Sequence, residues 1–115
     1  MNTSPKGIQF IAQFEGCHLH AYPDPTGTWT IGYGHTAGVT PNMSITMQQA
    51  LLYLAQDLTN KEKYVNKYNN VYHFTQDQFD ALVSFTYNCG QGNLNKLLSN
   101  GNKPIELIKV DLPNT

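Results

Sequence analysis

The segment from Leu19 to Thr36 constrains the fold more than any other, because its composition differs from that of the chain on both sides. It is rich in Tyr, Thr, Trp and Ile, and it is interrupted by Pro23, Pro25, Gly27, Gly32 and Gly34. β-Branched and aromatic residues favour strands, whereas proline and glycine favour turns. Helical periodicity precedes and follows this segment. We therefore predict an α+β fold in which a small, twisted antiparallel sheet is flanked by helices.

The first predicted helix ends in a glutamate. Ser4-Pro5 is typical of a helix start, because serine caps the first turn and proline needs no amide partner there. Gly16 is typical of a helix end. Apolar residues share one face of this helix with Glu15, at the spacing i, i+3, i+4 and i+7: Ile8, Ile11 and Ala12. The carboxyl group of Glu15 thus continues an apolar stripe instead of pointing into water.

A capping-box pattern, Thr46 followed by Gln49, predicts the start of a long second helix. Helical spacing of apolar residues continues this helix over residues 46–67. Tyr68-Asn69-Asn70 is predicted to break it.

A second capping box, Thr75 with Gln78, predicts a core helix that stops near Cys89-Gly90. A short leucine-bearing segment follows, and Asn100-Gly101 indicates a turn. Residues 104–110 fit either a further helix or a strand.

Length and charge exclude several classes of protein. With 115 residues the chain suits one hydrophobic core, so residues 1–115 are predicted to form a single domain. The formal net charge is −1 and there is no basic run, which argues against a nucleic-acid partner. No apolar stretch approaches the roughly 20 residues that a membrane-spanning helix needs. The polar N-terminal residues do not resemble a secretory signal, so we expect synthesis in the cytoplasm.

Three residues in the block from Glu15 to His35 suggest glycosidic-bond hydrolysis. This reaction needs one protonated and one ionised carboxyl group. The apolar face and the negative end of the helix dipole should both favour the protonated form of Glu15. Asp24 lies between two prolines in a turn that should be exposed, so it should stay ionised. Thr30 has a hydroxyl that could hold a water molecule by accepting and donating hydrogen bonds. Taken singly, each residue also has an ordinary structural explanation.

The joint pattern is more specific than its members. Together with Phe14-Glu15-Gly16, Ala21-Tyr22, Asp24 and Gly27, the run Thr30-Ile31-Gly32-Tyr33-Gly34-His35-Thr36 closely resembles the phage-type, T4-like lysozymes, or endolysins. The catalytic signature of that family is Glu, eight residues, Asp or Cys, five residues, Thr. Glu15, Asp24 and Thr30 match this spacing without a gap.

A second patch, residues 78–85 followed by Asn88-Cys89-Gly90, resembles the central core helix of the same family. The resemblance implies a lysozyme-like fold with a three-stranded sheet. The first helix and sheet would form a lobe over residues 1–45. A connecting helix would follow over residues 46–67, and then a helical lobe, shorter than usual, over residues 72–115.

The resemblance also implies an activity. It is cleavage of the β-1,4 bond between N-acetylmuramic acid and N-acetylglucosamine in peptidoglycan, with Glu15 as general acid, Asp24 assisting the attack of water and Thr30 positioning that water. Cleft-lining positions map more loosely: Thr36, Tyr87 and Asn88. If the reaction inverts the sugar carbon, the two carboxyl groups should lie ~6.5–9.5 Å apart. The chemistry needs no cofactor and no metal. In relatives the equivalent of His35 makes a structural ion pair.

The chain departs from the family after about residue 100, because residues 102–115 do not align with it. A reduced helical lobe would expose apolar surface, through which the chain could oligomerise. Two alternatives to an active muramidase follow: a relative that binds peptidoglycan without cutting it, and a lysozyme-type toxin domain of a bacterial antagonism system. An active muramidase or a toxin domain would act on the periplasmic or external cell wall after release from the cytoplasm.

Two cysteines and two histidines leave further alternatives. Cys17 and Cys89 could form a disulfide, but two buried free thiols are the favoured interpretation. His18 and His20 lie two residues apart on a predicted strand and could chelate a metal. No third ligand stands at a suitable spacing, so we interpret them as surface imidazoles.

Overall fold

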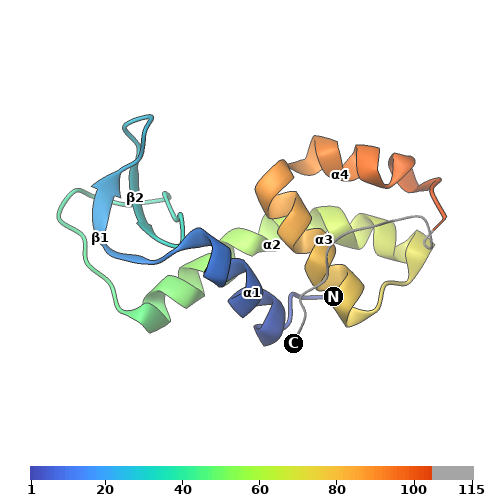
Figure 1. The fold of residues 1–115 in the computed structure, drawn as a ribbon, viewed down its shortest axis with the longest axis horizontal. Coiled ribbons are helices and arrows are strands. Elements are labelled where there is room, and N and C mark those ends of the chain that lie inside the picture. The colour runs from blue at the N-terminus through green and yellow to red at the C-terminus, as the bar shows by residue number, and fades with distance from the viewer. Residues whose placement is uncertain (105–115) are drawn as a thin grey trace. The chain divides into compact units, whose positions relative to one another are not determined.

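The computed structural model describes residues 1–104, and it confirms the α+β class (Figure 1). The elements follow in the order α1 Pro5–Glu15, β1 His18–Pro23, β2 Trp29–Gly32, α2 Met47–Tyr72, α3 Gln76–Cys89, α4 Gln91–Leu97 and a 3₁₀ turn, Ser99–Gly101. The chain divides into two compact units. One is Ile8–Asp57, and the other combines Met1–Gly7 with the described residues from Leu58 to 104.

The sheet of the unit Ile8–Asp57 has two strands within the described residues, where three were predicted. β1 pairs antiparallel with β2, with Tyr22 opposite Thr30. After β2 the chain turns back, and Ile31 and His35 exchange two backbone hydrogen bonds of 2.9 Å. Turns at residues 37–38 and 41–42 then carry the chain away before a ladder can form. Two isolated bridges, Ile31 with His35 and His20 with Ser44, therefore stand in place of a third strand.

The core of this unit packs the sheet against the first part of α2. Its buried apolar side chains are Ile11, Ile31, Tyr33, Ile45, Ala50 and Leu54. Gly32 lies at the contact: a Cβ there would stand 3.4 Å from the Cβ of Ala50 and 3.4 Å from Cδ1 of Ile45, and its φ is +66°. Burial of each large apolar side chain stabilises the unit by about 1.5–3 kcal/mol.

Helix α2 begins where its capping box predicts but ends later than expected. The amide of Thr46 donates to Oε1 of Gln49 at 2.9 Å, and the amide of Gln49 donates to Oγ1 of Thr46 at 3.1 Å. The predicted break at residues 68–70 is wrong, because α2 continues to Tyr72. Asn69 lies in the last turn of α2 and bonds to the residues that follow the helix. Its carbonyl accepts from the amide of His73, and its Oδ1 accepts from the amide of Phe74, both at 2.8 Å.

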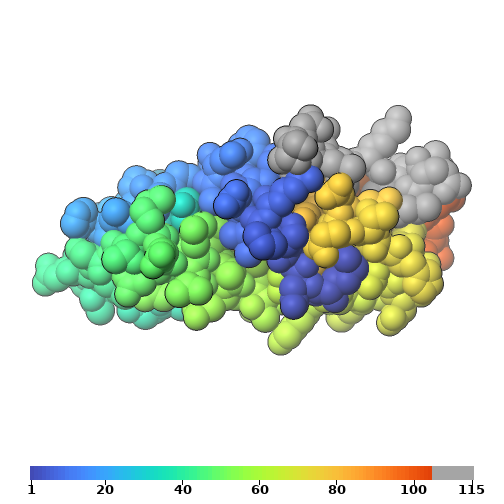
Figure 2. All heavy atoms as spheres, turned by 90° about the horizontal axis from the view of Figure 1, so that it is seen from below, coloured from blue at the N-terminus to red at the C-terminus, as the bar shows by residue number. Residues whose placement is uncertain are grey.

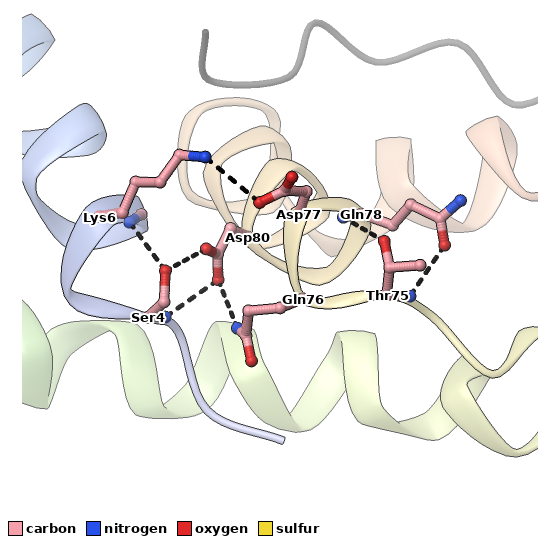
Figure 3. Close-up of polar contacts among 8 residues, drawn as sticks. Ser4, Lys6, Thr75, Gln76, Asp77, Gln78 and Asp80 are labelled. Atoms are coloured by element: carbon pink, nitrogen blue, oxygen red, sulfur yellow. Dashed lines mark hydrogen bonds and ion pairs between the residues drawn. The ribbon is translucent and has the colours of Figure 1, made fainter. Parts of the chain in front are cut away.

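Helix α3 forms the centre of the other unit. Its predicted capping box is present, with Thr75 and Gln78 as the reciprocal pair (Figure 3). Two tyrosines of α2 bond to the following segment: Tyr68 donates to Oδ1 of Asn95 at 2.6 Å, and Tyr72 donates to the carbonyl of Leu98 at 3.1 Å. The buried apolar side chains of this unit are Leu58, Val65, Phe74, Phe79, Ala81, Leu82, Val83, Leu94 and Leu98.

The start of α1 is fixed to α3 through Asp80, which is 1% exposed (Figure 3). The amide of Ser4 donates to Oδ1 of Asp80 at 3.0 Å, and the hydroxyl of Ser4 donates to Oδ2. Gln76 also donates to Oδ1, at 2.8 Å. The hydroxyl oxygen of Ser4 in turn accepts from the amide of Gly7 at 3.1 Å, which confirms Ser4 as the helix cap. In Figure 2 the N-terminal residues accordingly lie against α3.

The last described residues confirm the turn at Asn100-Gly101, where both residues have positive φ. The segment predicted as either helix or strand, residues 104–110, lies outside the described residues except for its first position. Within residues 1–104 no helix combines the length and the apolar character that crossing a membrane requires.

Candidate active site

Glu15 is the last residue of α1, as the sequence predicts, and its side chain is half-buried. Gly16 follows with a φ of +68°, a left-handed conformation that glycine adopts without strain, and the chain turns there toward β1. Among residues 1–104, no hydrogen bond or ion pair engages the Glu15 carboxyl group. The group is therefore not committed to a structural role within the described chain.

Asp24 follows β1 directly and organises the turn that leads into β2. Its Oδ1 accepts three hydrogen bonds: from the amide of Thr26 at 2.9 Å, the hydroxyl of Thr26 at 2.7 Å and the amide of Thr28 at 2.9 Å. The hydrogen bond from the Thr26 side chain, followed by that from the Thr28 backbone, lowers the pKa of Asp24 below its usual value. Asp24 is therefore ionised at neutral pH, as the turn position predicts.

Thr30 lies in β2 and is 4% exposed. Its hydroxyl donates to the carbonyl of Thr28 at 2.9 Å, so the hydrogen of that hydroxyl is already used. From the sequence alone, this hydroxyl is predicted both to donate to and to accept from a water molecule. The structure corrects that expectation: Thr30 Oγ1 can act toward water only as an acceptor.

Glu15, Asp24 and Thr30 all belong to the unit Ile8–Asp57. Asp24 and Thr30 are linked through one residue, because the amide of Thr28 donates to Asp24 and its carbonyl accepts from Thr30. Thr26 and Thr28 are not among the residues predicted from the sequence. The signal was present in the run Asp24-Pro25-Thr26-Gly27-Thr28, since an aspartate two residues before a threonine is typical of a side-chain-capped turn.

The three looser candidates are divided between the units. Thr36 lies in the unit Ile8–Asp57 and is exposed. Tyr87 and Asn88 lie near the end of α3 in the other unit, half-buried and exposed respectively. The side-chain amide of Asn88 donates to the carbonyl of Ser84 at 3.0 Å, within its own helix.

The predicted structural role of His35 is confirmed. The residue is buried, its Nδ1 lies 2.9 Å from Oδ2 of Asp57, and its ring stacks on Tyr53 with centroids 4.3 Å apart. His18 and His20 are both exposed: His18 packs on Tyr22, and Nδ1 of His20 lies 2.7 Å from the hydroxyl of Ser44. Across residues 1–104, no group of three His, Cys, Asp or Glu side chains is placed to hold a metal ion.

Both cysteines are free thiols, which is the favoured interpretation of the sequence. Cys17 is half-buried, with its Sγ 3.6 Å from Sδ of Met47. Cys89 is exposed, so the expectation that both thiols are buried is wrong for this residue. Its position, the last residue of α3, explains the exposure, because a helix end offers fewer packing neighbours than a helix centre.

Comparison with known proteins adds independent observations. The model of the phage lysozyme family matches residues 12–106. An endolysin of Bacillus phage PZA is 47% identical over 95 residues, which cover 80% of this chain and 36% of that protein. An endolysin of Acyrthosiphon pisum secondary endosymbiont phage 1 is 38% identical over 90 residues, covering 78% of this chain and 61% of that protein. The chain thus spans less than two thirds of the length of these relatives.

A solved structure is similar over most of the chain. The muramidase domain of SpmX from Asticaccaulis excentricus has a TM-score of 0.76 and 37% sequence identity. The match covers 88% of this chain and 69% of that domain.

Proposed function

This chain belongs to the phage lysozyme family, and from that premise we propose that it is a glycoside hydrolase that cuts bacterial peptidoglycan. The proposed bond is the β-1,4 linkage between N-acetylmuramic acid and N-acetylglucosamine. Peptidoglycan glycan strands are then its partner, and the cell wall is the place where it acts after release from the cytoplasm.

Glu15 is the proposed general acid. Its position at the end of α1, half-buried and without a hydrogen-bond or ion-pair partner among residues 1–104, supports this role. In the reaction, the Glu15 carboxyl group gives its proton to the bridging oxygen as the bond from that oxygen to the sugar carbon breaks. The leaving sugar thus departs as a neutral alcohol.

Asp24 and Thr30 are proposed to hold the attacking water. Oδ1 of Asp24 is occupied by three donors, whereas Oδ2 has no donor among residues 1–104. Thr30 Oγ1 is likewise an acceptor, because its hydrogen bonds to Thr28. A water between these two oxygens donates a hydrogen to each, so a lone pair is left to form the bond to the sugar carbon. Asp24 takes up the proton that the water loses.

The observation that carries this proposal is the connection of Asp24 and Thr30 through the peptide groups of Thr28, in a chain whose residues 12–106 match the family. An acceptor oxygen at the start of the turn and another in β2 are thereby linked through one residue. Attack by a water held in this way inverts the sugar carbon, and a carboxyl separation of ~6.5–9.5 Å is expected for Glu15 and Asp24.

Glu15→Gln tests the proposal. The amide keeps the shape of the side chain but has no proton to donate, so the rate of release of reducing ends from purified peptidoglycan should fall by about 10²–10⁴-fold. Asp77→Asn is the matched control, because it neutralises an exposed carboxylate whose contact with Lys6 is 3.5 Å long. Mass spectrometry of the products should show reducing N-acetylmuramic acid ends.

Two outcomes would count against the proposal. Equal rates for the wild type and Glu15→Gln would exclude Glu15 as the acid. A folded wild-type chain that is pulled down by sacculi and releases no reducing ends would indicate a binding protein instead of an enzyme.

A further inference from the structure

In the turn between β1 and β2, the two carboxylate oxygens of Asp24 differ in the hydrogen bonds that they accept. All three hydrogen bonds that the structure records for this carboxylate go to Oδ1, at 2.7–2.9 Å. Two of the donors are backbone amides, which any residue except proline could supply at those positions. The third is the hydroxyl of Thr26, which is the one side-chain donor to Asp24 among residues 1–104.

The hydroxyl of Thr26 has a fixed direction. Its oxygen also lies 3.1 Å from Oγ1 of Thr28. Asp24 is ionised and has no hydrogen to offer, so Thr26 must donate to Asp24 and must accept from Thr28. Two threonine hydroxyls and one carboxylate oxygen thus form a chain of hydrogen bonds that ends on Oδ1.

The turn itself does not depend on the Thr26 hydroxyl. The amide of Asp24 donates to the carbonyl of Thr28, and the amide of Gly27 donates to the carbonyl of Asp24, both at 2.9 Å. Gly27 supplies the positive φ of +87° that the turn requires, and Pro25 restricts the backbone just before it. Removal of the hydroxyl therefore leaves the backbone of the turn with all of its bonds. What it removes is a restraint on the carboxylate.

We propose that Thr26 is a positioning residue of the active site, whose hydroxyl holds Oδ1 of Asp24 so that Oδ2 is the oxygen presented to the attacking water. This inference rests on the proposed function. Without the hydroxyl, Oδ1 is held by the two backbone amides alone, so the carboxylate swings through a wider range about its terminal torsion, which is broad. The water is then held in the reactive position for a smaller part of the time.

The pKa of Asp24 gives a second readout. The Thr26 side-chain hydrogen bond is the largest cause of its lowered pKa, and the other lowering causes are backbone hydrogen bonds, not a neighbouring charge. A variant without the hydroxyl should therefore raise the pKa of Asp24. Because Asp24 acts in its ionised form, the acidic limb of the kcat/KM profile should move to higher pH.

The test compares Thr26→Val, which replaces the hydroxyl by a methyl group of similar shape, with Thr26→Ser, which keeps the hydroxyl. Thr40→Val is the matched control, because Thr40 is an exposed threonine of the same unit outside this turn. With purified peptidoglycan as substrate, Thr26→Val should lower kcat by about 10-fold, a fraction of what a full 1 Å misplacement costs. KM should be unchanged, because the sugar contacts are intact. Thr26→Ser and Thr40→Val should behave as the wild type.

A carboxyl-carbon NMR titration of Asp24 in the substrate-free protein measures the effect of the hydrogen bond on the pKa, independently of enzymatic activity. Thr26→Val should titrate at higher pH than the wild type, and Thr26→Ser at the wild-type pH. Equal titration of all three, or an unchanged kcat in Thr26→Val while Glu15→Gln is inactive, would overturn the role of Thr26. If Thr26→Val shows the expected NMR shift but the wild type releases no reducing ends, the proposed function is overturned instead.

Discussion

The contact between Gly7 and Asp80 predicts an unusual response to a substitution that normally stabilises helices. Alanine in place of a glycine in a helix interior stabilises it by about 0.5–1 kcal/mol. At Gly7, however, a Cβ would lie 2.7 Å from Cγ, 2.8 Å from Oδ2 and 2.9 Å from Cβ of Asp80. These distances are far below van der Waals contact, so either helix α1 or the Asp80 side chain must move.

The cost of Gly7→Ala has two parts. Overpacking of a well-packed contact costs about 1–3 kcal/mol. Displacement of Asp80 also weakens its bonds to Ser4 and Gln76, and hydrogen bonds to a charged group contribute about 1.5–3 kcal/mol. After the gain in helix propensity, we expect a net destabilisation of about 2–4 kcal/mol. At roughly 4 °C per kcal/mol for a chain of this size, Tm should fall by about 8–16 °C.

Urea and thermal unfolding followed by circular dichroism would measure this change. Gly92→Ala is the matched control, because Gly92 lies in α4 and a Cβ there meets no atom within 4 Å. It should be neutral or stabilising by up to about 1 kcal/mol. In an Asp80→Ala background, Gly7→Ala should cost less, because two of the three close atoms are gone. Equal stabilisation by Gly7→Ala and Gly92→Ala would refute the tight contact.

Two further substitutions test the packing of the units. Asp57→Asn removes the charge that Nδ1 of His35 contacts at 2.9 Å. It should lower the free energy of unfolding by about 1–2 kcal/mol in urea titrations. No change would show that the stacking on Tyr53 suffices to hold the ring. Thr75→Ala removes the cap of α3 and should cost about 1 kcal/mol by the same measurement, whereas wild-type stability would mean that water replaces the cap without loss.

Local signals in the sequence predicted the element starts well. The pairs Thr46 with Gln49 and Thr75 with Gln78 are capping boxes in the structure, because both partners lie within one turn of helix. The end of α2 was mispredicted for a related reason. Asn69 was interpreted as a helix breaker, but its side chain serves the amide of a residue five positions later. Propensity describes what a residue prefers on average, whereas its hydrogen-bond partner here depends on the path of the chain beyond it.

The spacing of Glu15, Asp24 and Thr30 predicted the candidate site residues, but a spacing carries no hydrogen-bond directions. The structure adds that the hydroxyl of Thr30 donates to the carbonyl of Thr28. Thr26 was missed because a threonine in a turn has an ordinary explanation. The contact between Gly7 and Asp80 joins positions far apart in the sequence, so no local pattern could indicate it.

The bonds at the N-terminal residues also impose an order on folding during synthesis. Met1, Thr3 and Ser4 bond to Asn66, Glu62 and Asp80, respectively, at separations of 65, 59 and 76 residues. On the ribosome, the cap of α1 therefore has no carboxylate to bind until Asp80 has been translated. Closing so long a loop costs entropy before its contacts can stabilise it. The helix that carries Glu15 thus gains this anchor only after the start of α3 has been made, and a nascent chain that stalls before Asp80 lacks it.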